Sequence, residues 1–546
     1  MTTIDPTAEV IASGVEAGDS ALGRLLAAAA DWLTSADHKK IGRLFLGGGL
    51  LGLLGTVAIN VILGIERSGI GNINDGAMAQ ILDAQRVGLV FGTLLPLAIG
   101  LCVAVVPMQL GARSLAFPRL AAAGFWMWAG GLTFSMIALV NNGGGLGGDP
   151  DMVDLFLGAH GLMAIGLAAT GVSIATSVLT TRAPGMSMRR VPFFAMSALV
   201  MGLGLVLLMP VLLGTLTYLF VDHRNGRQAF GGNTGLYDWA GWIFSPGAAM
   251  LFALPVAGLL AEGAPLLFKQ RTPARGVVFA GFGLMGVAAV GSVTQQAVHN
   301  VPWYGSDLNF GGSYEVRENL FDLVPWAMFN LLPLLGLTIV LLMVLLQAKP
   351  VKGARPNVTP AVAFGFLGLG MVMVGMIGTA LFAIEDLGLQ GTVFAEGALI
   401  YVVYGTVLAA LGGMAYWAPK LWGVNLPATK VLPFAGLGVL ATVLASLPSY
   451  VAGFDEPRDI YAILVLVGHV LMALTALGFI GLLVTSVMSS EGDAEADPYD
   501  GQTLEWATAS PAPANNFVDP PSVMSAEPLV DSKQNYGQID SEKGDS

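Results

Sequence analysis

The segment VGLVFGTLLPLAIGLCVAVVPM, residues 87–108, is long, apolar and free of charged side chains. A helix of about 20 apolar residues crosses the hydrocarbon core of a bilayer, which is roughly 30 Å thick. Inside that core every backbone amide needs a partner within the protein, and a helix supplies those partners itself. The segment therefore predicts a membrane-spanning helix.

Comparable apolar runs recur along the chain on both sides of this segment. We expect about twelve spans in total, each long enough to cross a bilayer as a helix. The sequence thus predicts an all-α integral membrane protein. The expected spans lie near 41–63, 87–108, 118–141, 153–180, 193–220, 240–267, 277–298, 320–347, 360–383, 394–418, 431–452 and 461–488.

The composition supports the same class of protein and excludes others. Of the 546 residues, 54% are hydrophobic and 11% are charged, whereas soluble domains carry about 25% charged residues. Most of the net charge of −12 comes from the acidic segment after Glu491, so the membrane body is nearly neutral and lacks a basic nucleic-acid footprint. The single cysteine, Cys102, excludes a disulfide framework and a thiolate metal site.

Basic residues concentrate in alternate connections between the expected spans, and lysine and arginine are retained on the cytoplasmic side of membranes. We therefore expect a multi-pass protein of the cell membrane with both termini in the cytoplasm. Residues 1–40 would form a cytoplasmic N-terminal segment and residues 41–490 a twelve-helix membrane domain. Residues 491–546, rich in Asp, Pro, Ser and Asn, would form a largely disordered acidic tail or lie against a partner.

Several short motifs carry a resemblance to a known family. They are DHKKIG at 37–42, AFPRL at 116–120, RAPGM at 182–186, YWAPK at 416–420 and TLEWATASPAPANNF at 503–517. In this order and spacing, the chain resembles subunit I of the haem-copper oxidases, of the cytochrome c oxidase type, over nearly its whole length. The resemblance implies a twelve-helix bundle in the respiratory chain.

The resemblance also implies six inward histidines that hold two haems and one copper, because these metals need imidazole nitrogen ligands. Matching the motifs places none of the six on a histidine of this chain. The matching positions are Ala84 or Gln85 on the second span, Ser245 on the sixth, Gln295 and Gln296 on the seventh, and Gly397 with Leu399 or Ala398 with Ile400 on the tenth.

Two further family features are altered. The acid at the mouth of the family's proton route matches Ser114 here. The paired arginines that hold haem propionates match Arg458 followed by Asp459, and an aspartate there would repel a propionate. We therefore predict no haem, no copper and no catalytic residues.

A few polar residues within the spans remain candidates for binding a cofactor or another ligand, because ionisable groups inside a membrane are costly and often functional. His38 and His223 are expected to be in solvent. Glu396 stands in the ligand region of the tenth span, and His160 and His469 lie on the fourth and twelfth spans. The weak candidates are Glu396, Gln295, Gln296, Arg458, His160 and His469.

Three functions stay open. The first is a subunit I-like protein without cofactors that acts as a structural, assembly or regulatory component beside subunit II- and III-like proteins or an assembly partner. The second is an active terminal oxidase with haem and copper, which passes electrons from cytochrome c to oxygen and translocates protons. The third is a repurposed bundle that binds a lipid, a quinone or another small molecule, lined by Glu396, Gln295 and Gln296.

Overall fold

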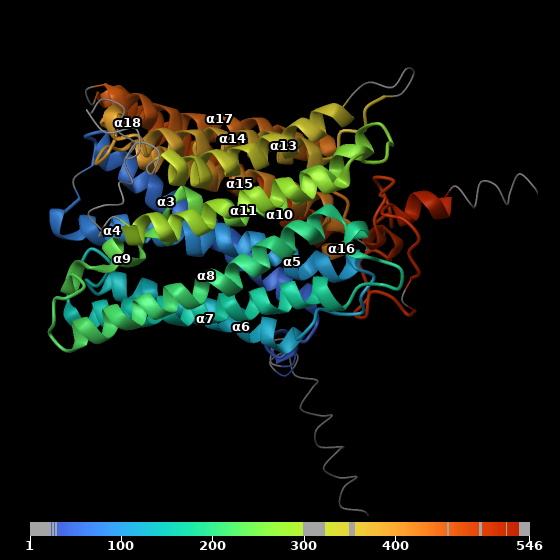
Figure 1. Ribbon diagram of the computed structural model, residues 1–546, viewed down its shortest axis with the longest axis horizontal. Coiled ribbons are helices and arrows are strands. Elements are labelled where there is room, and N and C mark those ends of the chain that lie inside the picture. Colours follow the sequence, from blue (N-terminus) through green and yellow to red (C-terminus); the bar gives the residue numbers. More distant parts are fainter. Residues whose placement is uncertain are drawn as a thin grey trace, which may run out of the picture.

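The computed structural model describes residues 30–71, 73–298, 323–348, 355–455, 458–490, 494–519 and 521–533, together with Gly23 and Ala27. Within these residues it contains 12 helices long and apolar enough to cross a membrane, which confirms the expected fold class and number of spans. The spans run side by side along the long axis of the molecule (Figure 1).

The bounds of the elements follow the chain order. The first half contains α3 (His38–Arg67), α4 (Asp75–Val87), the π-helix η1 (Gly88–Leu94), α5 (Leu95–Gln109), α6 (Pro118–Val140), α7 (Pro150–Thr180), η2 (Met188–Arg190), α8 (Phe193–Arg224), η3 (Gly232–Thr234), α9 (Leu236–Ala240), η4 (Gly241–Phe244), α10 (Pro246–Gly263) and η5 (Ala264–Leu267). The second half contains α11 (Arg275–Val298), the π-helix η6 (Ala327–Leu331), α13 (Leu332–Gln347), α14 (Pro360–Phe382), η7 (Glu385–Leu387), α15 (Phe394–Tyr416), α16 (Ala418–Trp422), α17 (Ala428–Phe454), α18 (Asp459–Ser489) and η8 (Leu504–Ala507).

Many helix starts combine a capping side chain with a proline in the first turn. Asp149 accepts hydrogen bonds from the amides of Asp151 and Met152, and Thr359 accepts one from Val362. A proline at this position loses no helical hydrogen bond, and the cap satisfies amides that the helix leaves free. These short polar motifs therefore define where α7 and α14 begin.

Three spans form the centre of the bundle. The most apolar windows of the second span (α4, η1 and α5) and of the tenth (α15) are 100% buried, and that of the sixth, which includes α10, is 89% buried. The remaining spans pack around them, with close contacts between α6 and α7, α7 and α8, and α17 and α18, and between α14 and the central α15. The core of the protein is thus made by the three spans on which the resemblance places most of the metal ligands.

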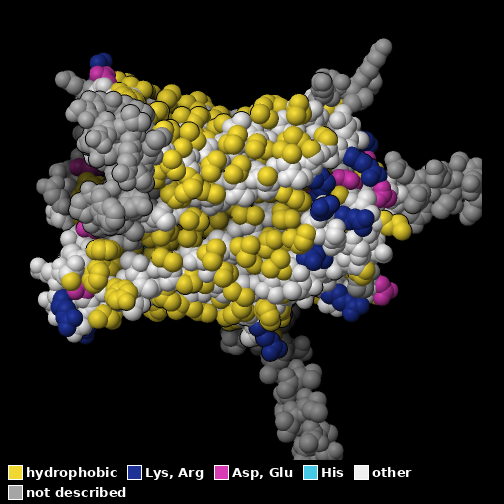
Figure 2. Space-filling view, in the orientation of Figure 1, with side chains coloured by type: hydrophobic (Ala, Val, Ile, Leu, Met, Phe, Trp, Pro, Cys, Tyr) yellow, Lys and Arg dark blue, Asp and Glu magenta, His cyan; other side chains and the backbone are white. Residues whose placement is uncertain are grey.

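Charged residues mark the two ends of the bundle. An apolar belt covers the middle of the face shown in Figure 2, and most of its Lys and Arg side chains gather at one end. The described part of the C-terminal tail lies at that same end, beside α16 (Figure 1). This arrangement is the one expected of a multi-pass membrane protein with a basic end and a less basic end.

The tail is ordered where the structure describes it, so the expectation of a largely disordered segment is wrong for residues 494–519 and 521–533. Lys39 of α3 donates hydrogen bonds of 3.1 Å to the carbonyl oxygen of Ala514 and to the side-chain oxygen of Asn516. Glu505 and Trp506 are buried, at 0% and 2% exposure. The tail is held because its polar groups satisfy buried polar groups at the end of the bundle.

Candidate functional site

A polar cluster links three spans at the end of the bundle opposite the tail. Arg67, at the end of α3, donates hydrogen bonds of 2.8 and 2.9 Å to the two carboxylate oxygens of Glu396 on α15. Gln85 of α4 donates a further hydrogen bond of 2.9 Å to Glu396. Two parallel bonds between a guanidinium and a carboxylate form the strongest common side-chain pairing.

A second set of hydrogen bonds, among buried side chains, joins the same two helices to α18. The side-chain amide of Asn60 on α3 donates a hydrogen bond of 2.8 Å to the hydroxyl of Tyr404 on α15, and that hydroxyl lies 3.0 Å from Nδ1 of His469 on α18. His469 is also close enough to Glu396 for the two to interact electrostatically. The structure therefore brings together two of the candidate residues, Glu396 and His469.

The polar groups of this cluster are hydrogen-bonded to one another. Glu396 receives three donors, and its side chain is 21% exposed. Buried or half-buried charges are stable when they are paired and hydrogen-bonded in this way. The cluster therefore holds helices together, because its hydrogen bonds and ion pair join α3, α4, α15 and α18.

The tenth span has no room for an axial ligand at Gly397. A Cβ atom added at Gly397 would lie 2.9 Å from the carbonyl oxygen of Ser446 and 3.0 Å from Cβ of Ser449, both on α17. Helix α15 therefore packs directly against α17 at this position. Because protein interiors are close-packed, a histidine and a haem would require these helices to separate.

The sixth span also has no imidazole at the matching position. The hydroxyl of Ser245 accepts a hydrogen bond of 3.2 Å from the amide of Ala248 and so caps α10. Two residues further along the chain, a Cβ added at Gly247 would lie 3.2 Å from the carbonyl oxygen of Ala288 on α11. Gln295 and Gln296 lie on α11, but their side chains are outside the described residues.

Among the described residues, none of those that the motifs match to the family's ligand positions is a histidine. Haem iron needs an axial protein ligand and copper needs several nitrogen donors. Of these positions, Gln85 is bonded to a carboxylate, Ser245 caps a helix, and Gly397 is in close contact with α17. Among the described residues, no three His, Cys, Asp or Glu side chains gather in a way that could hold a metal ion.

His160 lies apart from the polar cluster. Its Nδ1 is 2.9 Å from the carbonyl oxygen of Phe156, one turn earlier on α7. The ring is buried and packs against the rings of Phe156, Phe91 and Phe244. These contacts make His160 a core side chain surrounded by aromatic rings.

Arg458 lies at the start of α18 and its guanidinium is 3.0 Å from the carboxylate of Asp455. The side chain is 63% exposed. It forms a local ion pair within three residues of the chain and is not part of the cluster around Glu396.

The expectation that His38 and His223 lie in solvent is wrong. His38 is buried at the start of α3, where its Nε2 is 3.3 Å from the side-chain nitrogen of Asn516 in the tail. The side chain of His223 is 9% exposed and lies 2.7 Å from the carboxylate of Asp154. Both histidines were misjudged because they border spans, and their partners are distant in sequence.

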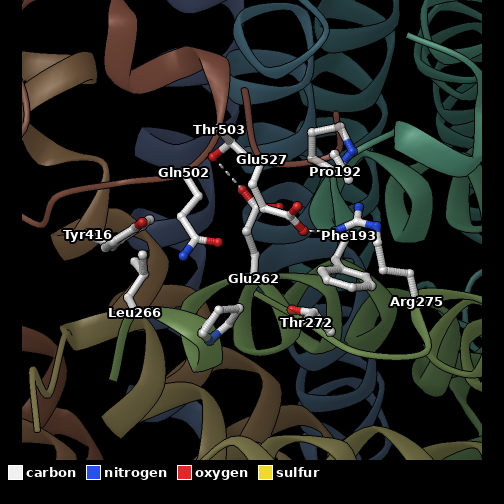
Figure 3. Close-up of a pocket in the computed structure, with 12 residues that line it drawn as sticks. Pro192, Phe193, Glu262, Leu266, Thr272, Arg275, Tyr416, Gln502, Thr503 and Glu527 are labelled. Atoms are coloured by element: carbon white, nitrogen blue, oxygen red, sulfur yellow. Dashed lines mark hydrogen bonds and ion pairs between the residues drawn. The ribbon is translucent and has the colours of Figure 1, made fainter. Parts of the chain in front are cut away.

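A second buried cluster seals the end of the bundle beneath the tail. Glu262 of α10 accepts hydrogen bonds of 2.5 Å from Gln109 and 2.9 Å from Thr503, and Gln109 also donates to Glu505. A cavity of about 10 Å³, large enough for roughly one water molecule, borders Glu262, Thr503 and Arg275 (Figure 3). Burial raises the pKa of Glu505 above its usual range.

Sequence reasoning missed Arg67, Tyr404, Gln109 and Glu505 as members of buried clusters. The position of Arg67 could have indicated a partner, since it is a basic residue at the end of the bundle that holds few basic residues. Glu505 gave no such indication, because an acid in an acidic tail is the ordinary composition of that segment.

Comparison with known proteins gives a consistent result. The family model described as Cytochrome C and Quinol oxidase polypeptide I matches residues 40–508. The chain is 27% identical to the probable cytochrome c oxidase subunit 1 of Bradyrhizobium diazoefficiens, over 93% of this chain and 79% of that protein. It is also 27% identical to cytochrome c oxidase subunit 1 of Bacillus subtilis, over 92% and 83%. It is 26% identical to cytochrome bo(3) ubiquinol oxidase subunit 1 of Buchnera aphidicola, over 93% and 80%.

Proposed function

Since the chain belongs to the Cytochrome C and Quinol oxidase polypeptide I family, we propose that it is a respiratory oxidase subunit I-like membrane protein that holds no haem or copper. Its role would be structural, in assembly or in regulation. The bundle keeps the family's fold, and its membrane faces and loops remain available to other proteins.

The observation that carries this proposal is the cluster of Arg67, Gln85 and Glu396. By the motif match, Gln85 is one of two positions that correspond to the haem histidine of the second span, and Glu396 is next to the positions that correspond to the two histidines of the tenth. Gln85 is bonded to a carboxylate, and Gly397, one of the matching positions on the tenth span, is in contact with α17. An ion pair and direct helix packing at these positions support a bundle without haem.

The same reasoning applies to the copper position. Ser245 caps α10, and Gly247 packs against α11 beside it. Ser245 matches the copper histidine of this span, and a serine hydroxyl that caps a helix is a poor ligand for copper, which prefers imidazole and sulfur donors. The proposal therefore does not depend on the haem position alone.

We place the protein in the cell membrane with both termini in the cytoplasm. Support comes from the basic end of the bundle (Figure 2), because Lys39 at the start of α3 is bonded to Asn516 of the tail. We also expect subunit II- and III-like proteins or an assembly partner beside it. Support for such partners comes from the relatives, which are named as subunit 1 of oxidases.

The experiment is a reduced-minus-oxidised optical spectrum with iron and copper analysis, on full-length protein purified from its native membrane. The matched control is the complex that contains cytochrome c oxidase subunit 1 of Bacillus subtilis, purified in the same way. We expect less than about one tenth of a haem per chain. Stoichiometric haem, or oxygen consumption with reduced cytochrome c, would reject the proposal in favour of an active oxidase.

The third possibility, a bundle that binds a small molecule near Glu396, has less support. Both carboxylate oxygens of Glu396 are already bonded to Arg67, and one also accepts from Gln85. A ligand would have to displace these donors.

A further inference from the structure

A groove opens on the membrane-facing side of α6, α7 and α8, at the end of the bundle opposite the tail. Its volume is about 450 Å³, within the usual range of roughly 300–1,000 Å³ for small-molecule sites. It is lined by Phe134, Asp151, Asp154, Leu155, Gly158, Ala159, Leu162, Phe220 and Arg224. Charged residues line one part of the groove and apolar residues the rest.

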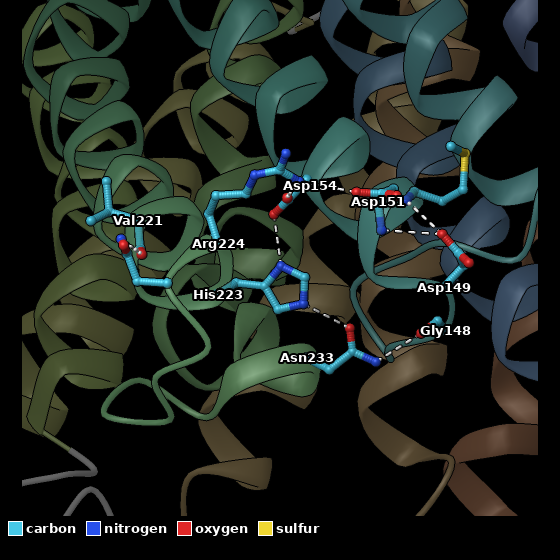
Figure 4. Close-up of polar contacts among 10 residues, drawn as sticks. Gly148, Asp149, Asp151, Asp154, Val221, His223, Arg224 and Asn233 are labelled. Carbon is cyan, nitrogen blue, oxygen red and sulfur yellow. Dashed lines mark hydrogen bonds and ion pairs between the residues drawn. The ribbon is translucent and has the colours of Figure 1, made fainter.

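The charged part is built from α7 and the end of α8. One guanidinium nitrogen of Arg224 is 3.0 Å from the carboxylates of both Asp151 and Asp154 (Figure 4). The Arg224 side chain is 62% exposed and that of Asp151 is 76% exposed, whereas that of Asp154 is 10% exposed. His223 supports Asp154 from the protein side through Nδ1 and contacts Asn233 through Nε2.

The formal charges of this part do not cancel. Two carboxylates face one guanidinium, so the mouth carries a net negative charge when His223 is neutral. Asp154 is bonded to both His223 and Arg224, whereas Asp151 is paired with Arg224 through Oδ1 and is 76% exposed, so its Oδ2 can meet a cation. Arg224 uses only one of its nitrogens on the aspartates and presents the rest of its fork of donors outward.

The apolar part of the groove presents side chains that an acyl chain could contact. Phe134 and Phe220 are 47% and 38% exposed, and Leu155 and Leu162 lie with them along the groove. Gly158 lies in the groove, and a Cβ added there would meet no atom within 4 Å. The floor is therefore open where a larger residue would fill it.

We propose that this groove binds one phospholipid with a primary amine headgroup, of the phosphatidylethanolamine class. The ammonium group lies at Asp151, the phosphate at Arg224, and an acyl chain runs over Gly158 between Phe134 and Phe220. A charged aspartate and a charged arginine side by side match a headgroup that carries one positive and one negative charge. The net negative mouth disfavours an anionic glycerol headgroup.

The test uses the full-length chain, stripped of lipid in detergent and titrated with ethanolamine, choline and glycerol phospholipids of identical acyl chains. Native mass spectrometry counts the lipids that each protein retains. We expect one tightly held ethanolamine lipid per chain, with a preference of roughly tenfold over the glycerol lipid. This binding is independent of whether the protein holds haem.

Two variants separate a built site from general lipid contact. Gly158→Leu fills the groove and should abolish the tight site, whereas Gly481→Leu on α18, where an added Cβ also meets nothing within 4 Å, should leave it intact. Asp151→Asn should remove the preference for ethanolamine over glycerol lipids. Equal retention of all three lipids, or unchanged binding in Gly158→Leu, would overturn the proposal. Cross-linking of the groove to a helix of another subunit in the native membrane, in place of lipid, would do so as well.

Discussion

The pairing of Arg67 with Glu396 is predicted to contribute measurably to stability, and a double-mutant cycle isolates that contribution. The cycle compares Arg67→Met, Glu396→Gln and the double variant with the unaltered chain. If the pair holds α3 to α15, the losses of unfolding free energy in the two single variants should add up to more than the loss in the double variant.

The magnitude follows from the geometry. Interhelical hydrogen bonds within membranes average about 0.6 kcal/mol, and exposed ion pairs give roughly 0–1 kcal/mol. Breaking a fully buried pair costs about 3–5 kcal/mol. The Arg67 and Glu396 side chains are 34% and 21% exposed and share two short bonds, so the pair lies between these limits. We expect a coupling energy of about 2 kcal/mol, in the range for hydrogen bonds to charged groups.

The assay is reversible unfolding of the full-length protein in mixed micelles, by titration with a denaturing detergent, followed by circular dichroism. The matched control is the same cycle on Arg458 and Asp455, a local pair with side chains 63% and 36% exposed. That control should give a coupling energy below about 1 kcal/mol. A coupling for Arg67 and Glu396 no larger than that of the control would refute the idea that the ion pair replaces cofactor contacts.

Two more predictions test the tenth span and the tail. Gly397→His combined with Gln85→His should restore no haem spectrum and should destabilise the protein by about 1–3 kcal/mol, because the new Cβ would lie 2.9 Å from the Ser446 carbonyl oxygen. Gly481→His is the control, and a haem band in the double variant would contradict the close packing. Burial raises the pKa of Glu505, so the folded state holds its proton more tightly than the free tail does. Docking of the tail should therefore weaken as pH rises from the usual carboxyl value through the raised one, seen as faster proteolysis of the tail. Glu505→Gln should remove this dependence, and an unchanged pH profile in that variant would show that another group controls docking.

The sequence by itself determined the class of protein and the number of spans. Hydrocarbon leaves an apolar segment such as residues 87–108 no alternative to a helix, because its backbone amides have no other partners. The same physics set the helix starts, since caps such as Asp149 act on the residues next to them. These are local rules, and a local rule can be read from neighbouring residues.

The tertiary structure alone decided which polar groups meet. Arg67 and Glu396 are separated by 329 positions, and Lys39 and Asn516 by 477, so no spacing or periodicity links either pair. The resemblance indicated which positions would lack imidazoles. The sequence showed no partner for Glu396, and only the packing of α3 beside α15 identifies Arg67 as that partner. A buried charge must find its partner wherever the packed helices place one, and that choice depends on how whole helices contact each other.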